Sequence, residues 1–565
     1  MDLCKRSLLP LIPLLLMPLS VCHAADTGYD LIIRNGHIID GTGSPWYAAD
    51  VAVKDGHIAA IGRLDTAKAA RVIDAHGMVV APGFIDMLGQ SELTLLVDPR
   101  VPSKIFQGIT TEITGEGESV APLDDVMIKE NQPGYDHYQI KPDWRTFAEY
   151  FARLEKQGLG INMGTYIGAA SVREMVIGYD DRDPSPDELK QMQALVEQGM
   201  QQGALGLSTA LQYPPAPYAK TEEIIALAQV ASRYGGIYAT HMRSEGNAEM
   251  KALDETFRIG REARIPIEIF HLKTSGKPNW GQMDKVIAHI EQARAAGVDV
   301  AADTYAYTAW ANGMAAFIPT WAKDGGTEKF LQRLKDPATR ARIRQDMLTP
   351  SDTWDNEWLA ITGPQDILIT AVNNKDLLKY EGKRVSEVAA EWHEDPMDTL
   401  YDFLLKDKGA TTVAVFGMDE ADVELALQQP WVSVDNDYSG ASVDNKILGS
   451  EHPHPRAYGT FPRILAKFVR EQKLLTLPDA VRKFTSLPAQ REHLTDRGVV
   501  KQGMWADLVV FDPALIHDVA TYEDPNRYSV GMQYVLVNGV PVIEEGKLTG
   551  KLPGKVLRGP GYTGR

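Results

Sequence analysis

Cysteine is almost absent from this sequence. The 565 residues include two cysteines, Cys4 and Cys22, and both lie within residues 1–24. In that stretch basic residues precede an apolar run, Leu8 to Val21, and small residues follow it, which is the pattern of a signal peptide cleaved near Ala24. We therefore expect an exported protein, periplasmic or secreted, whose mature chain has neither disulfide bonds nor thiolate metal ligands.

Long apolar runs are also missing. The run in the leader is broken by Pro10, Pro13 and Pro18, and it is shorter than the ~20 residues of a membrane-spanning helix. We expect no membrane span once the signal peptide is removed. The residues that end at Cys22 resemble a lipoprotein cleavage box only loosely, because Val21 is not small, so lipidation of Cys22 is left open as the alternative.

Clusters of Lys and Arg, glycine-rich phosphate-binding motifs, heptads and solenoid repeats are absent too. The chain has 58 Lys and Arg against 76 Asp and Glu, which gives a formal net charge of −18. Nonspecific binding of nucleic acid rests on a basic surface, so nucleic acid is excluded as a partner. The acidic balance favours solubility.

The sequence does contain short β-rich runs near both of its ends. In each region these runs are separated by turn signals, and Asn35-Gly36, Asp55-Gly56 and Asn538-Gly539 predict hairpin turns. We interpret residues 25–80 and 488–565 as two parts of one small β-sandwich.

Between these parts, from residue 81 to 487, short apolar runs alternate with helical patterns. Examples of the helical patterns are Asp187 to Gly203, Thr221 to Tyr234 and Asp284 to Ala296. This alternation predicts repeated βα units around a parallel sheet, and we expect a TIM-like (β/α)8 barrel. The segment of about 321–430 is longer than one crossover needs and carries charged helices, so we expect an insertion over the barrel mouth.

Two histidines close apolar runs of the predicted barrel. His241 ends the run GIYATH and His271 ends IPIEIFH, and a polar turn follows each of them. The carboxyl ends of barrel strands converge on the active site, so a pair of strand-end histidines with this separation predicts two ligands of one metal ion.

Two charged residues later in the chain complete the predicted chemistry. Asp437 closes the run WVSVDND, where a carboxylate can accept a proton from an activated water and pass it to a leaving nitrogen. Its alternative role is a turn or helix cap. Arg456 lies in HPRAYGTFPR and has the paired N–H donors that bind a carboxylate.

With these motifs the chain resembles the D-aminoacylase (N-acyl-D-amino-acid deacylase) branch of the amidohydrolase superfamily, from about Asp30 to Tyr562. The matching segments are APGFID from Ala81, QGITTEITG from Gln107, THMRSEG from Thr240, FHLKTSGKPNWG from Phe270, ADTYAYTA from Ala302, HPRAYGTFPR from His454, TSLPAQR from Thr485 and GKVLRGPGY from Gly554.

The resemblance implies a barrel flanked by a small β-sandwich, a zinc cofactor and hydrolysis of an amide in an N-acyl-D-amino acid or a dipeptide-like small molecule. His241 and His271 match its strand-end metal ligands, and Asp437 matches its catalytic aspartate. The residues that match its substrate-contacting positions are Lys273, Tyr305 or Tyr307, and Arg456.

The chain departs from this pattern at the first barrel strand. Family members follow PGFID with one residue and then His-x-His, whereas this chain has Leu88 and Gln90 at the two histidine positions. A Cys ligand expected after the next strand is replaced by the turn around Glu116 and Glu118. We therefore expect one zinc ion per chain on His241, His271 and Glu116, with Glu118 as the fallback for Glu116.

Two other functions remain open from the sequence alone. Loss of the His-x-His pair is compatible with a catalytically degenerate protein that binds a ligand without turning it over. A dipeptidase, a lactonase or a cyclic-imide hydrolase would use the same metal chemistry. The oligomeric state and the exact substrate are not encoded in any motif.

Overall fold

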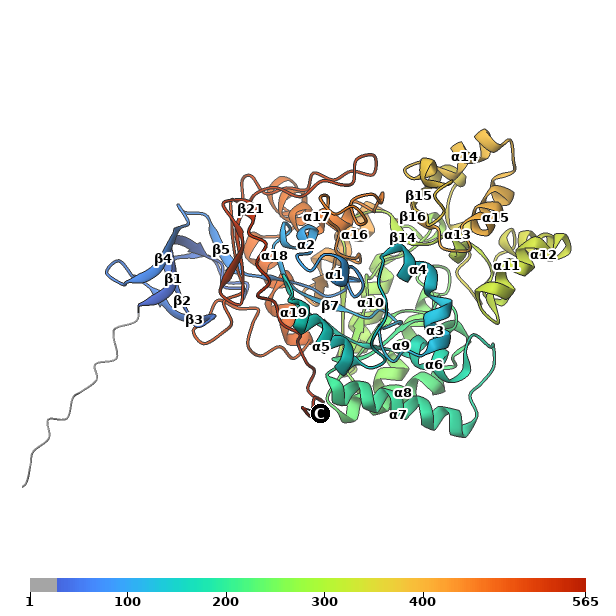
Figure 1. The fold of residues 1–565 in the computed structure, drawn as a ribbon, viewed down its shortest axis with the longest axis horizontal. Helices are drawn as coiled ribbons and strands as arrows, with labels where there is room; N and C mark the ends of the chain where they lie inside the picture. Colours follow the sequence, from blue (N-terminus) through green and yellow to red (C-terminus); the bar gives the residue numbers. More distant parts are fainter. Residues whose placement is uncertain (1–27, 565) are drawn as a thin grey trace, which may run out of the picture.

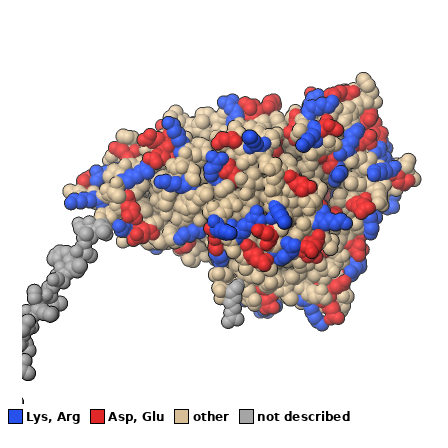
Figure 2. All heavy atoms as spheres, in the orientation of Figure 1, with Lys and Arg blue, Asp and Glu red and all other residues tan. Residues whose placement is uncertain are grey.

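The computed structural model describes residues 28–564. The predicted signal peptide, its cleavage site and both cysteines lie outside these residues. Among the described residues, no helix is both long enough and apolar enough to cross a lipid bilayer. On the face drawn in Figure 2, basic and acidic side chains are intermingled rather than gathered by sign.

Eight parallel strands form a barrel in the middle of the described chain. Their order is β6 (Phe84–Asp86), β7 (Ile109–Thr114), β8 (Asn162–Thr165) continued by β9 (Ile167–Gly168), β10 (Gly206–Ala210), β11 (Ile237–His241), β12 (Ile267–Ile269), β13 (Val300–Thr304) and β17 (Val432–Val434). The barrel closes where Gly89, after β6, pairs in parallel with Tyr438, after β17. The predicted (β/α)8 barrel is confirmed.

Helices follow the strands and cover the outside of the barrel. The three helical patterns chosen from the sequence correspond to α7 (Pro186–Gln202), α8 (Thr221–Arg233) and α10 (Met283–Ala295). Helix α7 begins where the Ser185 hydroxyl accepts the Glu188 N–H and the Glu188 carboxylate accepts the Ser185 N–H, a capping box. Further helices complete the cover: α5 (Phe147–Gln157), α6 (Ala169–Ile177), α9 (Glu249–Ala263), α16 (Glu420–Gln428) and α18 (Leu477–Phe484).

An apolar cluster fills the inside of the barrel below the strand ends. It is made by side chains of several different strands: Leu88, Ile113, Tyr166, Leu205, Ile237, Ala239 and Phe270. All of these side chains are at most 3% exposed, so they form a dry floor. Polar groups at the carboxyl ends of the strands therefore sit on an apolar base.

Both ends of the described chain meet in one nine-stranded sheet. Strands β1 (Tyr29–Ile38), β2 (Tyr47–Lys54), β3 (His57–Gly62), β4 (Ala69–Asp74) and β5 (Val79–Pro82) join β18 (Leu508–Phe511), β19 (Met532–Val537), β20 (Val540–Glu544) and β21 (Lys547–Leu548). The junction is the antiparallel pair β5–β18, and residues such as Ile33, Val80 and Leu508 share one apolar core. The predicted β-rich domain built from both ends is confirmed, with its strands hydrogen-bonded into a single sheet.

Two of the three predicted hairpin turns are confirmed and one is wrong. Asp55-Gly56 joins β2 to β3, and Asn538-Gly539 joins β19 to β20, with positive φ at all four residues. Asn35-Gly36 instead lies inside β1, where the register with β2 shifts between Ile33 and Gly36. Asn35 has a φ of 56° there, so the turn-like dipeptide forms a bulge. The bulge lets β1 pair with β4 before it and with β5 after it.

The segment between β13 and β17 carries a small subdomain of its own. It contains the antiparallel strands β14 (Trp310–Gly313), β16 (Thr412–Val415) and β15 (Ile367–Ala371), with helices α11 (Thr327–Lys335), α12 (Pro337–Met347), α14 (Val385–Trp392) and α15 (Pro396–Lys406). This subdomain starts before the predicted residue 321, and it ends before 430 because α16 packs on the barrel elements α10 and β17. Figure 1 shows it at the opposite side of the barrel from strands β1–β4.

Candidate metal and active site

Three side chains with metal-binding atoms meet at the carboxyl end of the barrel. His241 is the last residue of β11, His271 follows β12, and Glu116 follows β7. Their ligand atoms all lie within 4.8 Å of one another, and among residues 28–564 this is the one group of three or more His, Asp or Glu side chains that meets this condition. The structure therefore brings together the three ligands predicted from the sequence.

One carboxylate oxygen occupies the centre of this group. Glu116 Oε1 lies 3.0 Å from His241 Nδ1 and 3.0 Å from His271 Nε2. The side chains of His241 and His271 are 4% and 2% exposed, and that of Glu116 is 12% exposed. Nitrogen donors and a carboxylate oxygen in this arrangement suit a tetrahedral zinc ion that keeps one position for water. The donor set therefore fits the metal that the sequence resemblance implies.

The backbone conformation of two flanking glycines orients the Glu116 side chain towards the histidines. Gly115 and Gly117 flank it, with φ of +93° and +67°, values that residues with a Cβ rarely adopt. A Cβ on Gly117 would lie 2.4 Å from the Ala210 backbone nitrogen. Glu118, the fallback ligand, lies outside the group and lines a neighbouring cavity.

Glu245 is a site residue that the sequence reasoning missed. Its carboxylate lies 3.0 Å from His271 Nδ1, 3.6 Å from His241 Nε2 and 2.8 Å from Lys273 Nζ. A carboxylate behind a metal-ligating histidine fixes the ring orientation and its tautomer. The available signal was its place in THMRSEG, four residues after His241 and in the same strand-end loop.

The surroundings of the three site carboxylates shift their pKa values in different directions. Burial alone would raise the pKa of Glu116, but hydrogen bonds from His241 and His271 hold it well below its usual range. Burial likewise opposes ionisation of Glu245, yet the charges of His241, Lys273 and His271 lower its pKa. The pKa of Asp437 is raised, because burial outweighs the attraction of Arg456. Asp437 is therefore the carboxylate best suited to accept a proton.

Asp437 and Arg456 form a buried ion pair beside the three ligands. Arg456 Nη2 lies 2.8 Å from Asp437 Oδ2, and the two side chains are 2% and 8% exposed. Arg456 Nε and Nη1 are buried without a hydrogen-bond partner. Arg456 also lines the cavity, so the positive charge of this pair lies where a carboxylate of a bound molecule would meet it.

The two residues that replace the His-x-His pair lie in different surroundings. Leu88 is 1% exposed and belongs to the apolar floor of the barrel. Gln90 reaches into the cavity, where its Nε2 donates to Glu116 Oε2 and to Asp437 Oδ1, each at 2.9 Å. Neither side chain presents a nitrogen lone pair to a metal ion.

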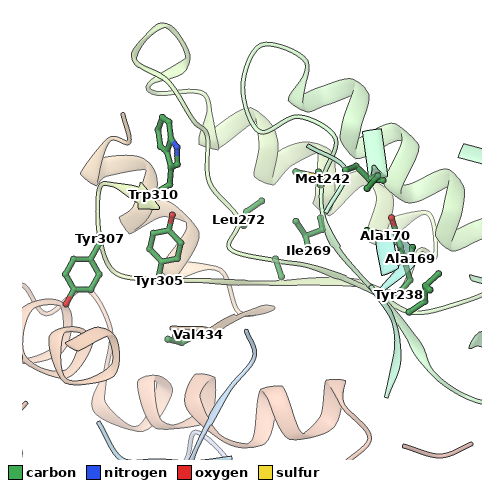
Figure 3. Packing of buried hydrophobic residues seen from close by; sticks show 14 of the residues in the cluster. Ala169, Ala170, Tyr238, Met242, Ile269, Leu272, Tyr305, Tyr307, Trp310 and Val434 are labelled. Carbon is green, nitrogen blue, oxygen red and sulfur yellow. The ribbon is translucent and has the colours of Figure 1, made fainter. Parts of the chain in front are cut away.

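Of the remaining residues predicted to contact substrate, Lys273 and Tyr305 lie at the site and Tyr307 does not. Lys273 lines the cavity, but its ammonium lies 2.8 Å from both Glu245 Oε1 and His271 Nδ1. Tyr305 packs under Arg456, whose guanidinium carbon lies 4.6 Å from the ring centre. Tyr307 points elsewhere, and Figure 3 shows the two tyrosine rings pointing in different directions. The Tyr307 hydroxyl donates to the Pro455 carbonyl at 3.4 Å, so it is not placed among the site residues.

A cavity of about 700 Å3 opens above the three ligands. The barrel loops supply one wall, and the subdomain between β13 and β17 supplies another through residues such as Trp310, Trp354 and Thr412. A second cavity of about 720 Å3 adjoins it, sharing Gln90 and Tyr213 as lining residues. The space accommodates a small molecule considerably larger than an acetylated amino acid.

The sequence profile of the amidohydrolase family matches residues 71–346 and 440–543 of this chain. D-aminoacylase of Alcaligenes xylosoxydans xylosoxydans is 36% identical over 533 residues, which cover 94% of this chain and 97% of that enzyme.

Two solved structures extend this similarity to the fold. N-acyl-D-glutamate deacylase from Bordetella bronchiseptica, in complex with zinc and a phosphonate mimic of the tetrahedral intermediate, has a TM-score of 0.78 and 32% identity, covering 94% of this chain and all of that one. A D-aminoacylase whose binuclear metal centre shows one-metal activation and second-metal attenuation has a TM-score of 0.77 and 34% identity, with the same coverage. The chain is therefore a member of the amidohydrolase family, similar over nearly its whole length to D-aminoacylases.

Proposed function

We propose that the protein is a metal-dependent hydrolase that removes the acyl group from N-acyl-D-amino acids. The observation that carries the proposal is the convergence of Glu116, His241 and His271 beside the Asp437–Arg456 pair, at the carboxyl end of a barrel. The relatives similar over most of the chain are a D-aminoacylase and deacylases of N-acyl-D-glutamate and N-acyl-D-aspartate. Site and similarity therefore favour the same reaction.

The proposed cofactor is one zinc ion per chain, held by Glu116, His241 and His271. Its support is the set of two imidazoles and one carboxylate, together with Leu88 and Gln90 at the positions where the family pattern has histidines. A related D-aminoacylase is activated by one metal, so a single ion suffices in a protein of this family. Zinc held there would polarise an amide carbonyl and lower the pKa of water.

The chain's own residues handle protons and substrate orientation. Asp437 accepts a proton from the attacking water and passes it to the amide nitrogen as the C–N bond breaks, which yields a carboxylate and a free amine. The raised pKa of Asp437 makes it a stronger base than a carboxylate in water. Arg456 binds the carboxylate of the amino acid, because its guanidinium lies beside Asp437 in the lining of the cavity and carries the matching charge.

A substrate panel tests the proposal. Purified protein is assayed for zinc content and for amine release from N-acetyl-D- and N-acetyl-L-amino acids. We expect one zinc per chain, hydrolysis of D-substrates, and loss of both zinc and activity in His271→Ala. Metal-free protein that binds these compounds without cleaving them would establish the degenerate ligand-binding function instead.

We propose further that the protein is exported. The support is the arrangement of basic, apolar and small residues in positions 1–24. Sequencing of the amino terminus of the protein purified from its native host tests this, and a mature chain that begins near Ala25 is the expected result. An intact amino terminus in the cytoplasmic fraction would contradict it.

A further inference from the structure

Gln90 lies between the two carboxylates on which the proposed function depends. Its Nε2 is 2.9 Å from Glu116 Oε2 and 2.9 Å from Asp437 Oδ1. An amide nitrogen carries two hydrogens, so one nitrogen can donate to both oxygens at once. The nitrogen must face them, because ionised carboxylates only accept hydrogen bonds.

Each of these carboxylates uses its other oxygen elsewhere. Glu116 Oε1 faces His241 and His271, and Asp437 Oδ2 faces Arg456. The oxygens that remain are the two that Gln90 joins. A hydrogen-bonded chain thus runs from Arg456 through Asp437, Gln90 and Glu116 to the histidines.

The backbone fixes Gln90 in this position. Its N–H donates to the Tyr438 carbonyl at 3.2 Å, one residue after Asp437. The preceding Gly89 donates to Ile113 in β7 at 2.7 Å, and a Cβ on Gly89 would lie 2.3 Å from Glu112 Oε2. Gln90 is therefore tied both to the strand that precedes Glu116 and to the loop that carries Asp437.

We propose that Gln90 is a positioning residue, whose amide fills the place between Glu116 and Asp437 that a second cation would otherwise fill. Two neighbouring carboxylates repel each other unless a positive or hydrogen-donating group separates them. A neutral amide separates them without attracting a second metal. It leaves Glu116 Oε1 to the metal and keeps Asp437 as a proton acceptor rather than a ligand. This inference rests on the proposed function.

Removal of the amide tests the proposal. Gln90→Met keeps the length of the side chain but has no N–H donor, and because Gln90 is exposed to the cavity the substitution leaves the core intact. Gln193→Met is the matched control, since the Gln193 amide donates to the Ala226 carbonyl on the outside of the barrel. Zinc affinity is measured by chelator competition, and kcat and KM are measured at saturating zinc.

We expect Gln90→Met to bind zinc about 10-fold to 100-fold more weakly and to lose about 10-fold to 100-fold in kcat, with KM within about threefold, as for other residues that orient metal ligands. The control should match the parent protein in all three values. If the Met variant does not fold, Gln90→Asn decides, because its shorter amide cannot reach both carboxylates and should show the same two losses.

The proposal requires both losses. A variant that keeps the parent zinc affinity, or the parent kcat, or changes only KM, overturns it. Failure of the proposed function looks different: the parent protein would then hydrolyse no N-acyl amino acid. Zinc affinity would still report on Gln90 in that case, and an unchanged affinity would refute the inference by itself.

The double variant Leu88→His with Gln90→His provides a second test. It removes the Gln90 amide and places an imidazole at each of positions 88 and 90, directly after β6. We expect metal analysis to find two zinc ions per chain in the variant and one in the parent. One ion in both proteins would contradict the view that the amide stands in for a second cation.

Discussion

At the scale of single residues, the identity and orientation of a few side chains determine whether this site can bind a metal ion. His241 and His271 come from neighbouring strands, but the third ligand depends on which of two glutamates turns inward. Glu116 meets the histidines, whereas Glu118 is exposed and lines the adjoining cavity. The difference between these neighbours gives a direct test of the metal site.

We expect Glu116→Gln to lower zinc affinity by more than about 100-fold, because a neutral amide oxygen is a poor zinc ligand. Glu118→Gln serves as the control and should keep the zinc content of the parent. Metal analysis after dialysis against a weak chelator distinguishes the two. Equal zinc content in both variants would remove Glu116 from the ligand set.

Asp437 is expected to matter for turnover but not for metal binding. Asp437→Asn keeps the shape of the side chain and removes its basicity, so kcat should fall by about 10² to 10⁴, the range for a lost general base or acid. Zinc content should not change. If kcat stays within threefold of the parent value, proton transfer belongs to another group.

At the scale of elements, the turn after β7 fixes the orientation of the Glu116 side chain. The sequence marks it as a glycine-rich turn, but only the structure shows how close Gly117 lies to Ala210 in β10. Gly117→Ala combines an unfavourable φ with a contact between a side chain and the backbone. We expect a loss of about 2 kcal/mol in the free energy of unfolding and weaker zinc binding.

Thermal unfolding of metal-free and zinc-loaded protein measures both effects of Gly117→Ala. Gly134→Ala is the matched control for stability, since Gly134 has open space around its Cβ position and lies in the helix α4 (Gln132–His137). A Gly117→Ala protein as stable as this control, with parent zinc affinity, would show that the turn tolerates a side chain.

Elements marked by a pattern within one short stretch of sequence could be predicted. Contacts between elements far apart in the sequence could not. Helix α7 has its capping residues and apolar face within one stretch, and the strand ends at His241 and His271 are marked by the change from apolar to polar residues. Asn35-Gly36 was misread because a bulge and a hairpin turn use the same backbone conformation, and the partners of β1 lie far along the chain. Gln90 likewise gains its role only from tertiary neighbours, Glu116 and Asp437.

At the scale of the whole molecule, buried carboxyls tie stability to pH. Glu492 accepts a hydrogen bond from Tyr166 inside the barrel, and burial raises its pKa to about 7 from 4.5. The folded state therefore holds a proton that the unfolded chain has released. The stability from this group is fully present below about pH 4.5 and is lost as the pH rises through about 7.

Glu492→Gln should remove this part of the pH dependence, because the amide stays neutral. From pH 5 to pH 8 the parent should lose on the order of 3 kcal/mol more than the variant in the free energy of unfolding. Urea unfolding at several pH values measures the difference, and parallel pH profiles of the two proteins would contradict it.

The pairing of β5 with β18 also sets an order of events during synthesis. When the ribosome has made the first five strands, the edge of β5 that will meet Val509 and Val510 has no partner, and the strands of the barrel follow before that partner exists. An unpaired edge of this kind invites wrong pairing with other chains. The complete nine-stranded sheet can therefore form only after β18 and the strands that follow it have left the ribosome, late in synthesis or after it.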